Sequence, residues 1–110
     1  MKTMQLQKAD DGFALLTLDA AGSMNVVNDA FIADMEAATT QIAEDDGIKG
    51  VILTSAKASF MAGADLKQLV NCFGTLTPSQ AYAFSKRATD MHRAIERSGK
   101  PWVAAINGLA

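Results

Sequence analysis

A run of small residues ahead of an aspartate is the part of this sequence best suited to chemistry. In SFMAGADLKQL, Ala62, Gly63 and Ala64 come directly before Asp65. Because alanine and glycine leave the backbone uncovered, a ligand can lie directly against their peptide N–H groups. Asp65 and Gln68 have the spacing of a capping box, so Ala64 is expected just before a helix N-terminus, where free N–H groups favour a negative oxygen. Backbone donors are therefore the predicted site.

A purely structural explanation of the same stretch stays open. In that alternative, Asp65 only caps the helix and the small residues only form a tight turn. Helix N-termini of this kind are common, and only some of them bind anions.

The other reactive side chains stand alone. The single histidine, His92, has no nucleophile near it in sequence, so a surface position is expected. The single cysteine, Cys72, has no disulfide partner and no metal-ligand pattern around it. We expect a half-buried structural thiol there and no metal site.

The elements that would position the site follow from apolar periodicity. Residues 4–8 and 13–19 predict two strands joined through the turn-forming ADDG. Asn28 is placed to cap a helix that ends near Gly47. Apolar residues recur along that helix at the 3.6-residue period and form one stripe: Phe31, Met35, Ala38 and Ile42.

Two continuous apolar runs, residues 49–56 and 102–106, predict strands covered on both faces, as in parallel sheets. We expect residues 50–54 and 102–106 to be parallel in one sheet. Between them lie the helix after Asp65 and a longer one that begins with a capping box from Thr77 to Gln80. The order β, β, α, β, α, α, β predicts an α/β fold with right-handed helical crossovers. The longer helix carries its own apolar stripe: Phe84, Ala88, Met91 and Ile95.

Length and charge exclude several functional classes. The 110 residues, about half of them hydrophobic, suit one globular unit. A net charge of −2 offers no basic stripe to hold nucleic acid. No segment reaches the roughly 18 apolar residues of a membrane span, and the start lacks a signal-peptide pattern. A cytoplasmic chain is expected.

Three motifs together resemble the enoyl-CoA hydratase/isomerase (crotonase) superfamily over essentially the whole chain: LDAAGSMNVVNDAFIADM, GVILTSAKASFMAGADLKQL and KPWVAAINGLA. Two of their details, MNVVNDAF and GADLKQLVNCFGTLTPSQ, are most similar to the hydratase part of multifunctional fatty-acid oxidation proteins, which carry a 3-hydroxyacyl-CoA dehydrogenase further along. The resemblance implies a spiral of ββα units, usually assembled as trimers or pairs of trimers. It also implies acyl-CoA thioester substrates, with no cofactor besides the coenzyme A of the substrate.

The resemblance further implies roles for single residues. In this family two peptide N–H groups stabilise a thioester enolate, and Ala64 matches the residue that supplies the first of them. Met24 and the small residues match backbone positions along the bound coenzyme A, and Lys67 matches a position near its phosphates and adenine. The expected substrate-binding set is Met24, Ala62, Gly63, Ala64, Asp65, Leu66 and Lys67.

The chain also departs from the family. The glycine-rich turn with the second N–H donor, and the catalytic glutamates, would lie beyond Ala110. Residues 1–110 are therefore expected to be an incomplete N-terminal part of a crotonase-like domain, truncated after a strand ending near Ile106 and inactive alone. Its apolar terminus should expose hydrophobic surface and associate. Many relatives have a basic residue ahead of Asn25, where this chain has Gly22, Ser23 and Met24, so contact with the phosphates should be weaker.

Three functional interpretations remain open from sequence. The first is part of an acyl-CoA hydratase/isomerase involved in fatty-acid β-oxidation. The second is a non-catalytic module that binds coenzyme A or acyl-CoA, and the third is a structural fragment of a nicked enzyme. A continuation with a Gly-Gly-Gly turn and a nearby glutamate would separate the first from the second.

Overall fold

A computed structural model describes residues 1–72 and 74–110. Within them, four strands form one sheet in the spatial order β1 (Met4–Lys8), β2 (Phe13–Leu18), β3 (Gly50–Ser55) and β4 (Trp102–Ala104). The hairpin of β1 and β2 is antiparallel, whereas β3 is parallel to both β2 and β4. The helices in this part of the chain are α1 (Asp29–Glu44), α2 (Leu66–Cys72) and α3 (Pro78–Glu96). This order and the α/β class confirm the prediction.

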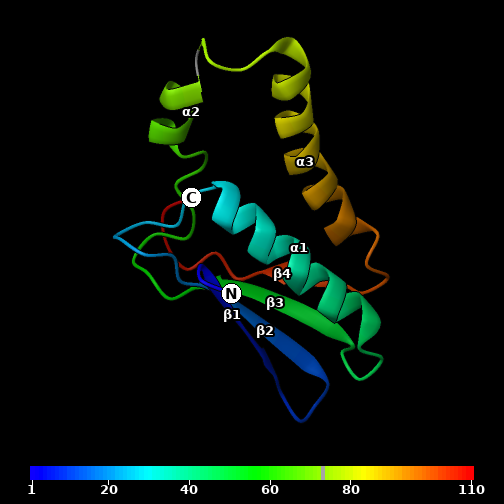
Figure 1. Cartoon of the computed structure of the whole chain (residues 1–110). Coiled ribbons are helices and arrows are strands. Elements are labelled where there is room, and N and C mark those ends of the chain that lie inside the picture. Colours follow the sequence, from blue (N-terminus) through cyan, green and yellow to red (C-terminus); the bar gives the residue numbers. More distant parts are fainter. Residues whose placement is uncertain (73) are drawn as a thin grey trace.

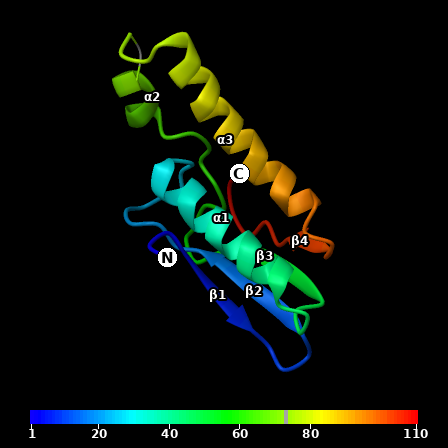
Figure 2. The same cartoon turned by 45° about the vertical axis from the view of Figure 1, so that its right-hand side comes forward.

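The helices lie on one side of the sheet. Figure 1 shows α1 across one face of the strands, and α3 packs against α1 on the side away from the sheet. The second view agrees and shows α2 and the start of α3 extending away from the strands (Figure 2). The molecule is therefore built in the order sheet, α1, α3.

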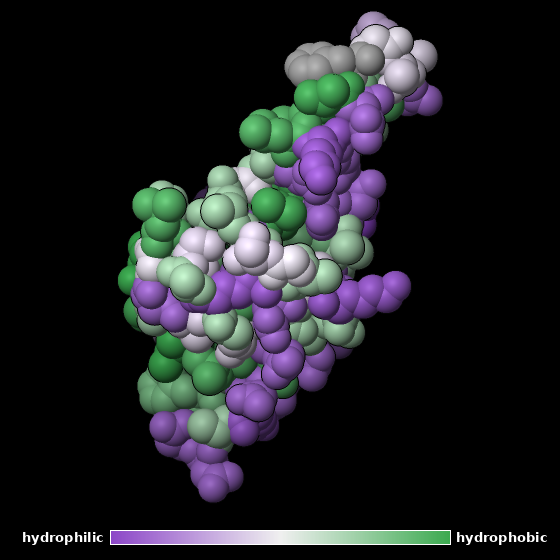
Figure 3. All heavy atoms as spheres, turned by 90° about the vertical axis from the view of Figure 1, so that its left-hand side faces the viewer, coloured by the Kyte–Doolittle hydropathy of each residue, from purple (hydrophilic) through white to green (hydrophobic). Residues whose placement is uncertain are grey.

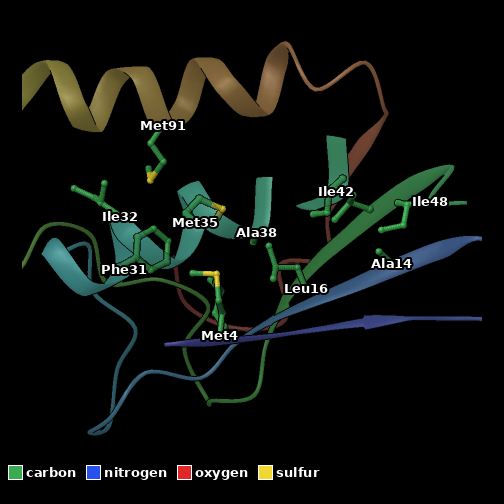
Figure 4. Packing of buried hydrophobic residues seen from close by; sticks show 12 residues of the cluster. Met4, Ala14, Leu16, Phe31, Ile32, Met35, Ala38, Ile42, Ile48 and Met91 are labelled. Atoms are coloured by element: carbon green, nitrogen blue, oxygen red, sulfur yellow. The ribbon is translucent and has the colours of Figure 1, made fainter. Parts of the chain in front are cut away.

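The hydrophobic core fills the space between these layers (Figure 4). Met91 of α3 points toward α1, and the buried residues of α1 lie over those of the strands. The core cluster consists of Met4, Ala14, Leu16, Leu18, Phe31, Ile32, Met35, Ala38, Ile42, Ile48, Val51 and Met91. The stripe predicted for α1 is thus entirely buried, because an amphipathic helix stabilises the fold by packing its apolar face.

Side-chain caps fix the starts of both long helices. The Asn28 side chain accepts a hydrogen bond from the Phe31 N–H at 2.9 Å. At α3, the Thr77 hydroxyl accepts from the Gln80 N–H at 3.2 Å, while the Gln80 side chain accepts from the Thr77 N–H at 2.9 Å. Both caps confirm the sequence prediction and satisfy N–H groups that lack partners within the helix. α1 ends at Glu44, slightly earlier than predicted.

The prediction that the parallel strands are covered on both faces is wrong for this chain. Side chains of the core face, such as Val51, are buried, but Ile52 is 38% exposed and Val103 is 61% exposed on the opposite face. Ile52 and Val103 are paired across β3 and β4, and Phe13 of β2 is also exposed. All the described helices lie on the other side of the sheet, so this apolar face meets solvent.

β4 is also shorter than predicted. It ends at Ala104 rather than near Ile106, although the Ala105 N–H still donates to the Leu53 carbonyl at 2.8 Å. Trp102 is half-buried against the core, and its indole N–H donates to the Ser98 hydroxyl at 3.0 Å. The parallel arrangement of β3 and β4 is confirmed.

Asp34 of α1 holds the first residues of the chain. One of its carboxylate oxygens accepts from the backbone N–H of Lys2 at 2.8 Å, and from the N–H and hydroxyl of Thr3 at 2.7 and 2.8 Å. Burial alone would raise the pKa of Asp34, but these hydrogen bonds outweigh it and hold the pKa below its ordinary value.

A depressed pKa in the folded state means that Asp34 stabilises the fold at neutral pH, and that this contribution is lost as the pH falls through the folded-state pKa. We expect Asp34→Asn to lower the free energy of unfolding by about 1 kcal/mol at pH 7. The difference from wild type should shrink below about pH 4 in urea unfolding. Asp46→Asn, at an exposed carboxylate, is the control. A deficit of the same size at pH 7 and pH 3 would contradict the role of the ionised form.

Candidate functional site

Two segments far apart in sequence form one cleft. It lies between the loop before α1 and the segment before α2, with a volume of about 580 Å³. All the residues of the predicted set except Gly63 line it, although Met24 is separated from the others by α1 and β3. The lining residues are Ser23, Met24, Val26, Ala62, Ala64, Asp65, Leu66 and Lys67.

A short parallel bridge brings these segments together. The Val27 N–H donates to the Gly63 carbonyl at 2.8 Å, and the Asp65 N–H donates to the Val27 carbonyl at 3.0 Å. In a parallel pairing, the residue between the two bonded neighbours directs its own N–H and C=O to the opposite side. That residue is Ala64. Among residues 1–72 and 74–110, no protein acceptor takes the Ala64 N–H, and Ala64 is exposed in the cleft.

The neighbouring small residues have different backbone roles. The Ala62 N–H donates to the Asn25 carbonyl at 2.9 Å, so it is used in joining the segments. Gly63 has φ of +99°, a conformation that glycine adopts without a steric penalty. Its carbonyl is occupied by Val27. Neither the Gly63 N–H nor the Ala64 N–H has an acceptor among the described residues, but of these two residues Ala64 is the one that lines the cleft.

Asp65 caps α2, but the predicted capping box does not form. One Asp65 carboxylate oxygen accepts from the N–H groups of Lys67 and Gln68 at 3.0 and 3.4 Å. The Gln68 side chain does not return to Asp65, because the Asp65 N–H is already bonded to Val27. Instead, Gln68 pairs with Asp29 at the start of α1, donating to its carboxylate at 3.1 Å and accepting from its N–H at 3.3 Å. This pair links the first turns of α1 and α2.

The rim of the cleft combines apolar side chains with one cation. Met24 is 49% exposed and Leu66 is 73% exposed, and Lys67 is exposed beside them. Figure 3, drawn from the side that α2 occupies in Figure 1, shows hydrophobic residues gathered on α2 next to hydrophilic ones. The rim therefore suits a ligand with both apolar and anionic parts.

A lysine fixes the loop that carries Met24. The Lys57 ammonium donates to the Gly22 carbonyl at 2.9 Å and lies 3.4 Å from the Asp19 carboxylate. Only 14% of the Lys57 side chain is exposed. A charge that is largely buried requires polar partners. Because Lys57 contacts both Asp19 and Gly22, it holds the two ends of the turn formed by residues 19–22.

Sequence reasoning missed three residues of this site. Ser23 and Val26 line the cleft, and Asn25 is buried beneath it at 1% exposure. A polar residue in an otherwise apolar stretch, as in SMNVV, was the available signal for Asn25, because buried polar groups need hydrogen-bond partners. Ala20, one partner of its side chain, lies five residues earlier, but Ser55 and Phe60 lie 30 and 35 residues further along the chain, where no local pattern indicates them.

Other hollows on the described surface differ from this cleft in their lining. Another hollow, of about 870 Å³, is an open acidic surface along α1 with Glu36, Glu44 and Asp45 on its lining. Glu36 pairs there with Arg87 of α3 at 2.9 Å, and this hydrogen bond lowers the pKa of Glu36. Within the two described ranges, no group of three histidine, cysteine, aspartate or glutamate side chains could hold a metal ion.

The positions predicted for His92 and Cys72 are confirmed. His92 is exposed at the edge of an apolar cavity of about 190 Å³, and Cys72 is half-buried. None of the helices described here is long and apolar enough to cross a membrane.

Comparison with models of known protein families gives a match over most of the chain. The model of the enoyl-CoA hydratase/isomerase family matches residues 8–110. The chain belongs to this family. This membership confirms the resemblance inferred from the SFMAGADLKQL stretch and its neighbours.

Several relatives with similar sequences are named as subunits of a fatty acid oxidation complex. The fatty acid oxidation complex subunit alpha of Idiomarina loihiensis is 35% identical over 109 residues, which cover 97% of this chain and 15% of that protein. The subunit of the same name from Shewanella amazonensis is 39% identical with the same coverage. The chain thus spans about 15% of the length of these relatives. They confirm the predicted likeness to fatty-acid oxidation proteins.

Solved structures show the same fold. The enoyl-CoA hydratase of Bacillus anthracis superposes with a TM-score of 0.85 at 26% identity, covering 99% of this chain and 41% of that one. A crotonase-type structure from Legionella pneumophila gives a TM-score of 0.87 at 20% identity, with coverages of 98% and 41%. The crotonase-like fold predicted from the sequence is therefore confirmed.

The bridge that exposes the Ala64 N–H depends on the backbone of Gly63. Gly63 and Gly99 have φ of +99° and +77°, and at both positions the space for a Cβ atom is open. We expect Gly63→Ala and Gly99→Ala each to lower the free energy of unfolding by about 1 kcal/mol, since both strain the backbone. Gly63→Ala alone should shift the amide NMR signals of Val27 and Asp65. Equal shifts in the Gly99→Ala control would contradict the assignment of this bridge to Gly63.

Proposed function

We propose that this chain supplies the first oxyanion donor of an enoyl-CoA hydratase/isomerase that acts in fatty-acid oxidation. The observation that carries the proposal is the backbone N–H of Ala64, which has no acceptor among the described residues and lies in the cleft beside the small side chain of Ala62. Family membership and the fatty acid oxidation relatives support the substrate class.

The chemistry follows from where charge develops. Addition of water to a 2-enoyl thioester, or movement of its double bond, passes through an enolate with negative charge on the thioester oxygen. A fixed N–H donor lowers the energy of that state more than the energy of the ground state, so it accelerates the reaction. The bridge to Val27 fixes the Ala64 N–H before the ligand arrives.

The rim of the cleft supports an acyl-CoA ligand. Met24 and Leu66 offer apolar surface to the acyl and pantetheine parts, and Lys67 offers a positive charge to the phosphates. Because the loop before Asn25 has no cation at residues 22–24, Lys67 is the charge on the cleft lining that attracts these phosphates. Coenzyme A arrives with the substrate, so no separate cofactor is proposed.

The remaining catalytic groups come from outside these residues in this proposal. The chain covers 41% of the solved hydratase from Bacillus anthracis, which supports the interpretation of residues 1–110 as one part of a larger crotonase-like domain. We propose that the second N–H donor and the acid/base glutamates lie in the rest of that domain, and that this piece is inactive alone. Assembly into trimers or pairs of trimers is part of the same proposal and rests on the family resemblance.

The test removes the Ala64 donor in the whole protein that carries this chain. Ala64→Pro deletes an N–H that has no acceptor among the described residues, so the fold should survive where the ring fits. We expect turnover of crotonyl-CoA to fall by about 100- to 1,000-fold, as for other oxyanion donors.

The control is Ala64→Gly, which keeps the N–H and should retain turnover within about tenfold of wild type. Circular dichroism would establish that both variants are folded. Near-normal turnover by a folded Ala64→Pro protein would exclude the oxyanion role. Tight binding of crotonyl-CoA without any turnover in the whole wild-type protein would favour a non-catalytic binding module.

A further inference from the structure

We propose that Asn25 is a positioning residue, whose buried carboxamide sets the distance between the two walls of the cleft and thereby the direction of the Ala64 N–H. The identity of the ligand in this inference rests on the proposed function. The positioning itself rests on hydrogen bonds within the protein, which can be tested without a ligand.

The carboxamide of Asn25 is buried and fully bonded. Its oxygen accepts from the Ala20 N–H at 3.0 Å. Its NH2 group donates to the Ser55 hydroxyl at 2.9 Å and to the Phe60 carbonyl at 3.0 Å. With 1% of the residue exposed, water cannot replace these partners. One side chain therefore joins three segments: the loop between β2 and α1, the end of β3, and the loop between β3 and α2.

The backbone of Asn25 continues the same junction toward the cleft. Its carbonyl accepts from the Ala62 N–H at 2.9 Å, and the bridge between Val27 and the residues flanking Ala64 follows directly. Three backbone hydrogen bonds thus connect the loop before α1 to the loop after β3, and Asn25 lies at the buried end of this series. A shift of the carboxamide would move Ala62, and with it the peptide of Ala64 two residues later.

Ser55 connects these paired loops to the sheet. The Ser55 hydroxyl donates to the Ser59 carbonyl at 2.8 Å and accepts from the Lys57 N–H at 2.9 Å, besides accepting from Asn25. The Asn107 side chain bonds to the backbone of Ser55. It donates to the Ser55 carbonyl at 2.7 Å and accepts from the Ser55 N–H at 3.3 Å. Since Ser55 is the last residue of β3, Asn25 is held against a rigid element.

Asparagine is required here because the site needs one acceptor and two donors. An aspartate has almost the same shape but only accepts when ionised, so it would face the Phe60 carbonyl without a proton and place a charge in a buried position. Asn28, three residues later, offers a matched control. Its side chain only accepts, from the Phe31 N–H, and aspartate serves equally well as a helix cap.

The experiment compares Asn25→Asp with Asn28→Asp by amide hydrogen exchange of the chain, followed by NMR. For Asn25→Asp we expect exchange at Val27 and Ala62 to rise at least tenfold more than exchange at Val51 and Ala105, whose N–H groups bond within the sheet region. For Asn28→Asp we expect no such local difference. A uniform rise at all four amides, or no rise, would show that Asn25 only adds global stability and would overturn the proposal.

Two further measurements keep the test decisive. If Asn25→Asp does not fold, Ser55→Ala removes one partner of the carboxamide and should give the same local pattern at smaller amplitude; a uniform pattern would overturn the proposal. Titration of the whole protein that carries this chain with butyryl-CoA, a saturated acyl-CoA that cannot be hydrated, should give a dissociation constant at least tenfold higher for Asn25→Asp than for Asn28→Asp. Equal constants would also overturn the positioning role. Absence of binding by wild type would instead reject the proposed function, while the exchange pattern would still decide the role of Asn25.

Discussion

The pairing of Val27 with the residues on either side of Ala64 is the constraint on which the site depends. It consists of two hydrogen bonds of 2.8 and 3.0 Å, and it joins a loop before α1 to a loop after β3. It uses the carbonyl of Gly63 and the N–H of Asp65, so the peptide N–H between them is directed away from the protein. A donor held in this way needs no reorganisation when a ligand's oxygen arrives, which is the property that makes preorganised backbone groups effective.

Local signals in the sequence predicted most of the fold. The caps at Asn28 and Thr77 and the apolar stripe of α1 depend on residues within one or two turns of each other, and these predictions are confirmed. The order of strands followed from the same kind of periodicity. Burial of the strands was predicted wrongly at Ile52 and Val103, because a continuous apolar run indicates that a strand has two apolar faces and not what covers them.

The sequence predicted most of the residues that line the cleft, but it did not predict the hydrogen bonds that connect them. The stretch from Ala62 to Lys67 was identified from small residues and family resemblance, and all of it except Gly63 lines the cleft. The partner of Gln68 was missed because the competing bond from Asp65 to Val27 spans 38 positions of the chain. Long-range pairing thus decided which of several reasonable local hydrogen bonds formed, and a single sequence does not contain that information.

The three hydrogen bonds of the Asn25 side chain limit how the site can evolve. No other side chain reproduces its acceptor and two donors at that length, so position 25 has little freedom to vary. Ser23 and Met24 immediately before it are exposed and contribute lining without structural bonds of their own among the described residues. In the function proposed above, substitutions at these two exposed positions would alter which acyl-CoA is preferred, while Asn25 would keep the oxyanion donor in place. Under that proposal, selectivity could change from one descendant of the protein to the next while the reaction itself stayed the same.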